Sequence, residues 1–271
     1  MRAVERPVER RGTPRALTGD RPADRDLVVA EEPLEIRIGG ESLMVTMRTP
    51  GDDLDLTAGL LFTEGVIASL AEIESLAHAR ENGSGAENIV DVTAAGGHAL
   101  AVGAARRVLR ATAACGLCGK ESIAAVRRRV PRITDDLRVP LGRVLAMPAA
   151  IRAEQQVFEA TGGLHAVGLF DQDGALLLVR EDVGRHNAVD KVIGARLRGG
   201  AASFARTVMF LSGRAGFELV QKAAVAGVPV VCSVSAPSAL AVDLAQEAGV
   251  TLVGFVRGGS ANVYTHPHRI A

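Results

Sequence analysis

The sequence predicts an α/β protein in which a three-layer α/β/α domain follows a smaller α+β portion. Hydrophobic residues make up 48% of the 271 positions, which is enough for a large core. After Thr161, short and almost wholly apolar segments alternate with segments of helical periodicity. Strands that are apolar on both faces are typical of a parallel sheet covered by helices on each side. We therefore expect such a sheet to form the C-terminal domain.

Composition narrows the class of function. The chain has 31 basic and 31 acidic residues, so no net charge draws the whole protein to nucleic acid or to an anionic membrane. No segment reaches the roughly 18 apolar residues of a membrane span, and the N-terminus lacks the apolar core of a signal peptide. Three cysteines do not make the paired framework of a small secreted protein. We expect a cytoplasmic protein that binds neither nucleic acid nor membrane.

The chain is predicted to begin with a disordered leader and a hairpin. Residues 1–26 combine proline, glycine and charges of both signs, which is typical of disorder. Residues 34–38 and 42–48 then flank Gly39 and Gly40 in the manner of two strands joined by a tight turn.

The next segment predicts a helix that starts at Asp52 and Asp53 and ends at Gly65, because acidic residues favour a helix start and glycine favours its end. The pattern that follows is less regular. Strands are predicted at 88–94 and 106–113, and helices at 120–130 and 150–160. The chain is therefore predicted to have three parts. These are the disordered leader at residues 1–26, the smaller α+β portion at 27–134 and the α/β/α domain at 135–271.

The C-terminal domain shows the clearest alternation. Two strands come first, and three units of helix followed by strand come after them. The predicted strands are 164–171, 176–182, 208–213, 229–235 and 250–258, and the predicted helices are 187–197, 217–226 and 240–248.

The segment CGLCGKES contains the most distinctive chemical groups, because Cys115 and Cys118 stand between glycines just before a predicted helix. A thiolate near a helix N-terminus and Lys120 is favoured in its charged, nucleophilic form. Two thiols at this spacing can form a disulfide, bind a metal, or hold a sulfane sulfur with one thiol assisting the other.

Three other interpretations of the pair stay open. Zinc would need two more ligands, for which His266 and His268 are candidates. A thioredoxin-like redox motif fits the spacing but not the position in the chain. The cysteines could also be structural, although flanking glycines suit core packing poorly. The third cysteine, Cys232, lies in an apolar run and is predicted to be part of the core.

A second cluster of ionisable residues follows a predicted strand in the segment REDVGRHNAVDKVIG. Asp182, His186 and Lys191 are its candidate site residues. In an open α/β sheet, ligands bind outside the carboxyl ends of the strands, so this position favours a binding site. The alternative is a helix start at which these three side chains satisfy one another without a ligand.

Small and polar residues also follow the three later strands. These are Ser212, Gly213 and Arg214 in SGRAG, Ser235 in SVSAPS, and Arg257 with Gly258, Gly259 and Ser260 in VRGGS. Backbone amides in such turns, together with arginines, suit phosphate groups at helix N-termini. Three such turns at neighbouring strand ends predict one crevice for a phosphorylated, nucleotide-like ligand, although loops of this composition are also common. His165, in TGGLHA, stands just before a predicted strand. It is either a structural histidine or a further residue of the candidate site.

Several segments in a fixed order resemble the formate dehydrogenase accessory sulfurtransferase family, FdhD. The resemblance extends from Glu31 to Ile270 and rests on EEPLEIRI, TPGDDLDLTAGLLFTEGVI, CGLCGKES, TGGLHAVGLFD, REDVGRHNAVDKVIG, SGRAGFELVQKAA, VSAPSALAVDLA and TLVGFVRG followed by NVYT.

The resemblance implies a cytidine-deaminase-like fold, a homodimer and a cytoplasmic sulfurtransferase. A cysteine desulfurase would hand over sulfur as a persulfide on Cys115, with Cys118 assisting. The sulfur would then pass to the Mo-bis(molybdopterin guanine dinucleotide) cofactor before that cofactor enters formate dehydrogenase. The family's cofactor-binding segment matches Phe255, Val256, Arg257, Gly258, Gly259 and Ser260, and guanine nucleotide would occupy the strand-end turns. The zinc signature of deaminases is missing, so the resemblance does not imply deamination.

The competing hypothesis is a chaperone that binds the same cofactor for formate dehydrogenase. In that case the two cysteines would form a structural or redox pair.

Overall fold

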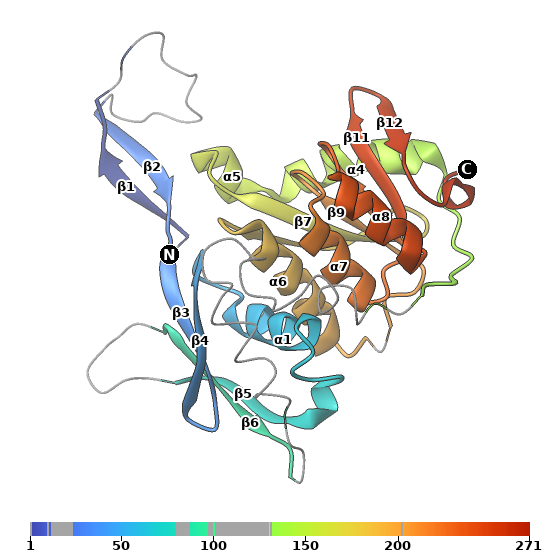
Figure 1. Ribbon diagram of the computed structural model, residues 1–271. Coiled ribbons are helices and arrows are strands. Elements are labelled where there is room, and N and C mark those ends of the chain that lie inside the picture. The colour runs from blue at the N-terminus through green and yellow to red at the C-terminus, as the bar shows by residue number, and fades with distance from the viewer. Residues whose placement is uncertain are drawn as a thin grey trace.

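The computed structural model describes residues 2–9, 11, 24–79, 87–96, 100, 130, 132–201 and 203–271. Three sheets account for the strands in these ranges: a two-stranded ribbon, a four-stranded sheet and a six-stranded sheet (Figure 1). The expected strand at 106–113 and the expected helix at 120–130 lie outside the described residues. The α/β fold class is confirmed.

The N-terminal ribbon differs from the sequence prediction. β1 (Ala3–Pro7) pairs antiparallel with β2 (Arg25–Val29), and the ribbon projects from the rest of the molecule (Figure 1). The expectation that residues 1–26 are disordered is therefore wrong for the strand positions. The pattern was missed because β1 has few apolar residues and is held by pairing with residues about twenty positions later. Arg2 also forms an ion pair with Asp52, which ties the start of the chain to the beginning of α1.

The four-stranded sheet forms the core of the smaller portion. Its strand order is β4-β3-β6-β5, with β3 (Glu32–Ile38), β4 (Glu41–Arg48), β5 (Ile73–Ala79) and β6 (Ile89–Ala94). The predicted turn between β3 and β4 is confirmed, since Gly39 and Gly40 both have positive φ, which costs glycine little. The predicted helix is confirmed as α1 (Asp53–Thr63), and its apolar face packs on this sheet.

A buried arginine attaches the start of α1 to the four-stranded sheet. Arg48, at the end of β4, is 1% exposed. Its Nε and Nη2 donate to the two carboxylate oxygens of Asp53 at 2.9 and 3.0 Å, and Nη2 also donates to Asn88 at 2.8 Å. This two-pronged pairing satisfies both charges, which burial requires.

The six-stranded sheet has the order β12-β11-β10-β9-β7-β8. Its strands are β7 (His165–Asp171), β8 (Leu176–Asp182), β9 (Thr207–Leu211), β10 (Val230–Ser233), β11 (Thr251–Arg257) and β12 (Ser260–Val263).

The expected parallel arrangement of this sheet is wrong in part. β9, β10 and β11 are parallel, but β7 runs antiparallel to both of its neighbours, and β12 runs antiparallel to β11. The physical reason is the short turn between β7 and β8, which allows only an antiparallel pair. β8 consequently runs in the same direction as β9, with β7 between them.

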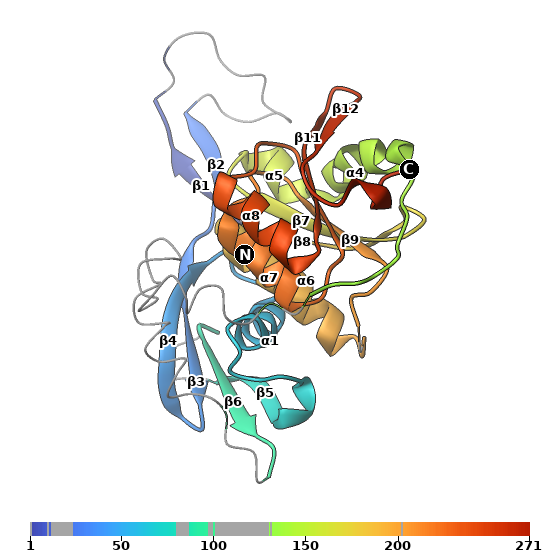
Figure 2. The same ribbon diagram turned by 45° about the vertical axis from the view of Figure 1, so that its right-hand side comes forward.

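Helices cover both faces of the six-stranded sheet, as predicted (Figure 2). α6 (Arg185–Arg198), α7 (Phe217–Val225) and α8 (Ala239–Ala248) pack against one face. α4 (Leu141–Glu154) packs against the other and is followed by α5 (Gln156–Thr161). The helix predicted at 150–160 begins nine residues earlier in the structure, at Leu141. The sequence interpretation placed its start too late because Pro148 lies inside α4, and proline usually ends a helix pattern.

α1 and α6 join the two portions of the protein. They cross with glycines at the contact, Gly59 on α1 and Gly194 on α6, so that the two backbones touch. Buried ion pairs surround the crossing. Lys222 of α7 binds Asp190 at 2.9 Å and Glu64 at 3.0 Å, and although burial opposes its charge, these two carboxylates raise its pKa.

The strands of the small sheet all precede residue 95, and those of the large sheet all follow residue 164. The proposed boundary between residues 134 and 135 stays a prediction. In the ranges that the structure describes, no helix combines the length and apolar character that crossing a membrane requires.

Candidate functional site

The predicted strand-end turns meet at one edge of the six-stranded sheet. The turns after β9 and β10 are hydrogen-bonded to each other and to the last part of β11: Ser235 N donates to Gly213 O at 3.3 Å, and Phe255 N donates to Ser235 O at 3.2 Å. Ser212 links the same edge to β7, because its Oγ accepts from Ala166 N at 2.9 Å. The structure therefore brings Ser212, Gly213 and Ser235 together with the start of the C-terminal segment, as the sequence predicts.

The segment from Phe255 to Ser260 forms the end of β11 and the turn into β12. Phe255 has φ +55°, a left-handed conformation that is uncommon for a bulky residue, and Gly258 and Gly259 also have positive φ. The guanidinium of Arg257 lies 5.4 Å from the centre of the Phe255 ring, and Ser260 Oγ donates to Arg257 O at 3.2 Å.

Val256 has a different environment from the rest of this segment. Its side chain is fully buried in the core on the α4 side of the sheet, so only its backbone faces the turn. The neighbouring Gly254 has no room for a β-carbon, which would lie 2.9 Å from Pro237 and 3.0 Å from Tyr264. Tight packing below the segment thus holds its unusual backbone in place.

Asp182 occupies the end of β8 but has no exposed surface. Its Oδ2 accepts from Lys191 Nζ at 2.8 Å and from Thr49 N at 3.1 Å, while Oδ1 accepts from Gly184 N at 2.8 Å and Asn187 Nδ2 at 3.1 Å. Every acceptor position is used within the protein. A direct contact between Asp182 and a ligand stays a prediction, and in the structure its carboxylate instead fixes the turn into α6.

His186 and His165 lie at the same edge of the sheet. His186 Nε2 is 2.7 Å from Glu218 Oε2 at the start of α7. The other oxygen of this glutamate, Oε1, is buried and has no partner among the described residues. Burial lowers the pKa of His165, and the nearby Arg185, His186 and Arg214 lower it further, so its imidazole is neutral at pH 7.

The sequence predicts His186 as a binding residue but gives no sign of its carboxylate partner. Glu218 comes 32 positions later, and only the fold places the starts of α6 and α7 side by side. Arg214 is exposed at this edge.

Cys115 and Cys118 lie outside the described residues, so their predicted roles stay predictions. Cys232 is fully buried in β10, and burial raises the pKa of its thiol, which confirms its predicted place in the core. The two histidines considered as zinc ligands stand edge to face with their ring centres 6.0 Å apart, and His266 Nε2 lies 3.1 Å from Gln246 O. Among the described residues, no three histidine, cysteine, aspartate or glutamate side chains are grouped as a metal site would require.

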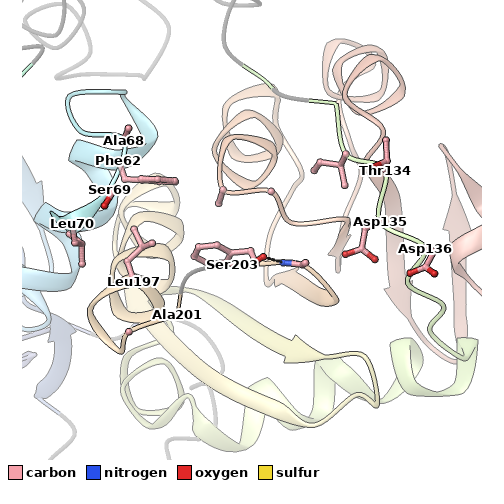
Figure 3. A pocket seen from close by; sticks show the side chains of 16 residues that line it. Phe62, Ala68, Ser69, Leu70, Thr134, Asp135, Asp136, Leu197, Ala201 and Ser203 are labelled. Atoms are coloured by element: carbon pink, nitrogen blue, oxygen red, sulfur yellow. Dashed lines mark hydrogen bonds between the residues drawn. The ribbon is translucent and has the colours of Figure 1, made fainter. Parts of the chain in front are cut away.

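Two cavities lie at opposite edges of the six-stranded sheet. One, of about 480 Å³, opens at the carboxyl edge between α4, α5 and the starts of the site turns, and His165 and Ser212 line it. The other, of about 920 Å³, lies at the amino edge of β9 and contains no predicted site residue (Figure 3). Leu197, Ser203 and Asp135 are among its lining residues (Figure 3).

The smaller cavity contains residues that the sequence interpretation missed. Arg152, Gln155 and Phe158 line it from α4 and α5. The arginine guanidinium lies 4.6 Å from the centre of the Phe158 ring. No signal identified these residues, because the helix that carries Arg152 was predicted only in part and the cavity forms between segments that are distant in sequence.

Comparisons with known proteins place this chain in a family. The model of the FdhD/NarQ family matches residues 29–271. A protein named sulfur carrier protein FdhD from Streptomyces avermitilis is 50% identical over 98% of this chain and 96% of its own length. A protein of the same name from Streptomyces coelicolor is 49% identical over 98% of this chain and 96% of its own length.

A solved structure shows the same architecture. A crystal structure from Desulfotalea psychrophila, described as a formate dehydrogenase accessory protein, superposes with a TM-score of 0.71 at 26% sequence identity. The match covers 93% of this chain and 95% of that one. The family model, the close relatives and the shared fold lead to one conclusion. This chain belongs to the FdhD/NarQ family.

Proposed function

We propose that this protein is a cytoplasmic sulfur carrier for formate dehydrogenase maturation. It takes sulfur from a cysteine desulfurase as a persulfide on Cys115 and transfers it to the molybdenum of Mo-bis(molybdopterin guanine dinucleotide) before the cofactor is inserted into the enzyme. The observation that carries the proposal is similarity over nearly the whole chain to proteins named sulfur carrier protein FdhD, in a sequence that contains CGLCGKES.

The loading step is a thiol exchange that needs no added oxidant. The Cys115 thiolate attacks the terminal sulfur of the desulfurase persulfide, so that a new S–S bond forms on Cys115 and the donor S–S bond breaks. The desulfurase cysteine leaves as a thiolate. Cys118 assists by its proximity in sequence, and Lys120 supplies a positive charge that favours the thiolate of the pair.

The cofactor is cargo and binds at the strand-end turns of the six-stranded sheet. Backbone amides at the starts of α6 and α7 have no side-chain cap, and Arg185 and Arg214 add positive charge beside them. Helix starts of this kind favour phosphate, and guanine nucleotide alone can occupy the same turns. The segment from Phe255 to Ser260 borders them through its hydrogen bond to Ser235. The protein acts as a homodimer.

Intact mass spectrometry tests the loading step. The full-length protein is incubated with cysteine and a desulfurase, and wild type is compared with Cys115→Ser, Cys118→Ser and the control Cys232→Ser. We expect a gain of about one sulfur mass, about 32 Da, that reductant reverses and that only Cys115→Ser abolishes. Absence of added sulfur on every variant, with guanine nucleotide still bound, would instead make the protein a cofactor-binding chaperone whose cysteines are structural or redox-active.

A further inference from the structure

The larger cavity, of about 920 Å³, lies between the two portions of the protein and has an apolar wall. Phe62 and Leu70 come from the smaller portion, and Leu197 comes from α6. All three side chains are only partly buried, so the cavity presents apolar surface that water reaches. Pockets for drug-sized ligands typically measure about 300–1,000 Å³, so this cavity has room for more than one side chain of a partner.

The opposite side of this cavity is acidic. Asp135 and Asp136 lie there, across the opening from the apolar wall (Figure 3). The carboxyl ends of α6 and α7 also border the cavity, through Gly200 and Gly227, and such helix ends carry a negative partial charge. No lining residue in the part of the chain that the structure describes is basic. The cavity therefore combines apolar surface with negative charge.

Most polar side chains of the lining are engaged within the protein. Ser69 Oγ and Ser203 Oγ each accept from a backbone amide two positions later, at 3.0 Å. The two carboxylate oxygens of Asp135 accept from two further backbone amides, at 2.7 Å each. Asp136 has only an exposed ion pair with Arg206 at 3.2 Å, and pairs of this kind are worth little. An apolar side chain next to a cation fits these surroundings better than a small polar ligand does.

The cavity lies where the two ends of the cysteine-containing stretch of the chain meet the described fold. Leu100 packs on the apolar cluster of the four-stranded sheet, as Leu70 does. Val130 packs on the cluster between the six-stranded sheet and its helices, as Leu197 does, and Phe62 contacts both clusters. The cysteine pair stands between Leu100 and Val130 in the sequence. A protein bound in the cavity would therefore lie beside both attachment points of the stretch that receives sulfur in the proposed function.

We infer that this cavity is the docking site for the sulfur donor. A surface segment of the cysteine desulfurase places an apolar side chain against Phe62, Leu70 and Leu197 and a lysine or arginine beside Asp136. This inference rests on the proposed function and identifies where its protein donor binds. The exchange of sulfur needs the donor and acceptor cysteines in contact, and docking raises their effective concentration.

Sulfur loading from two different donors tests the inference. The full-length protein is incubated either with cysteine and the desulfurase or with glutathione persulfide, a small donor that needs no docking site. In both reactions the Cys115 thiolate takes the terminal sulfur and the donor leaves as a thiolate. Intact mass spectrometry follows the rate at which the protein gains about 32 Da.

Three variants change the cavity, and two variants are matched controls. Ala68→Trp and Ala205→Trp fill the cavity from exposed positions in its lining, and Asp136→Lys reverses the charge on its acidic side. Ala146→Trp on α4 and Asp243→Lys on α8 are the controls, because both positions are exposed and neither lines the cavity. Thermal unfolding of each variant checks that it is folded.

We expect both cavity-filling variants to slow loading from the desulfurase by about tenfold or more, and Asp136→Lys to slow it by about three- to tenfold. Loading from glutathione persulfide stays as in wild type, and the two controls match wild type with both donors. Added salt slows desulfurase loading of wild type but not of Asp136→Lys, because salt screens the attraction that this substitution removes.

Loading of the three cavity variants at the wild-type rate from the desulfurase would overturn the docking site and leave the sulfur-carrier proposal standing. Equal slowing with both donors would also overturn it, because the cavity would then serve the cysteine-containing stretch itself and not the donor. If only glutathione persulfide loads the wild type, the desulfurase is not the donor and the docking site is wrong. If neither donor loads the wild type, the carrier function itself fails.

Discussion

Gly59 and Gly194 lie where α1 and α6 cross, and neither position has room for a methyl group. A β-carbon on Gly59 would stand 1.9 Å from the carbonyl oxygen of Asp190, and one on Gly194 would stand 1.8 Å from that of Asp55. In both cases the obstacle is the backbone of the opposing helix, which cannot rotate away as a side chain can. This contact fixes the distance between the two portions of the molecule.

Gly59→Ala and Gly194→Ala are therefore expected to destabilise the protein by about 3 kcal/mol or more, because the helices must separate. Chemical denaturation measures the loss. Gly142→Ala is the control: it also places alanine in a helix, but open space surrounds the site, so we expect a gain of about 0.5–1 kcal/mol. Similar stability of the three variants would show that the crossing tolerates a wider spacing.

The buried pair of Asp182 and Lys191 gives a second prediction. Asp182→Asn keeps the shape of the side chain but leaves the Lys191 ammonium, which has no exposed surface, without its counter-charge. Removing one member of a buried ion pair costs about 3–5 kcal/mol. Urea unfolding measures the change, and a loss of less than about 1 kcal/mol would contradict the description of Lys191 as a cation that depends on this partner.

Thr49 provides a third prediction, because it joins the loop before α1 to the end of β8. Its Oγ1 accepts from Val183 N at 3.1 Å, and its carbonyl accepts from Lys191 Nζ at 2.9 Å. Thr49→Val leaves the Val183 amide without an acceptor and is expected to cost about 1–3 kcal/mol. Thr49→Ser keeps the hydroxyl and serves as the control. A loss for Thr49→Val no larger than that for Thr49→Ser would show that the hydrogen bond from the Val183 amide contributes little to stability.

The lowered pKa of His165 predicts a pH dependence of stability. The unfolded histidine titrates near about pH 6.5, whereas the folded one titrates lower because of burial and the charges of Arg185, His186 and Arg214, partly offset by Asp182. Between these two values the unfolded state binds more protons, so the free energy of unfolding falls as the pH drops below about 6.5. His165→Gln is expected to flatten this slope. Denaturation curves of both proteins between pH 5 and pH 8 provide the measurement, and parallel slopes would contradict the assignment.

Local signals in the sequence predict much of the fold. The turn at Gly39 and Gly40, the helix from Asp53, and the alternation of strands and helices after Thr161 all depend on residues that are neighbours in sequence. Elements whose stability comes from distant pairing were missed. β1 has no pattern of its own, and the antiparallel pairing of β7 with β9 joins strands that are far apart in the sequence.

The candidate site was also predicted only where its residues follow local patterns in the sequence. The sequence predicts that the turns after the later strands meet at one sheet edge, because carboxyl ends of parallel strands always do. It also raises the alternative that Asp182, His186 and Lys191 satisfy one another. In the structure Asp182 pairs with Lys191, whereas His186 pairs with Glu218. It does not predict the partner of His186, since Glu218 belongs to another helix, nor the wall made by Arg152 and Phe158.

The burial of Cys232 has a practical consequence for thiol chemistry. The chain has three cysteines, and a thiol with no exposed surface and a raised pKa is closed to alkylating reagents while the protein stays folded. Label incorporated under native conditions therefore excludes Cys232, which becomes available on denaturation. The native protein thus contains an internal standard, because label on Cys232 reports unfolding separately from any label on the other two cysteines.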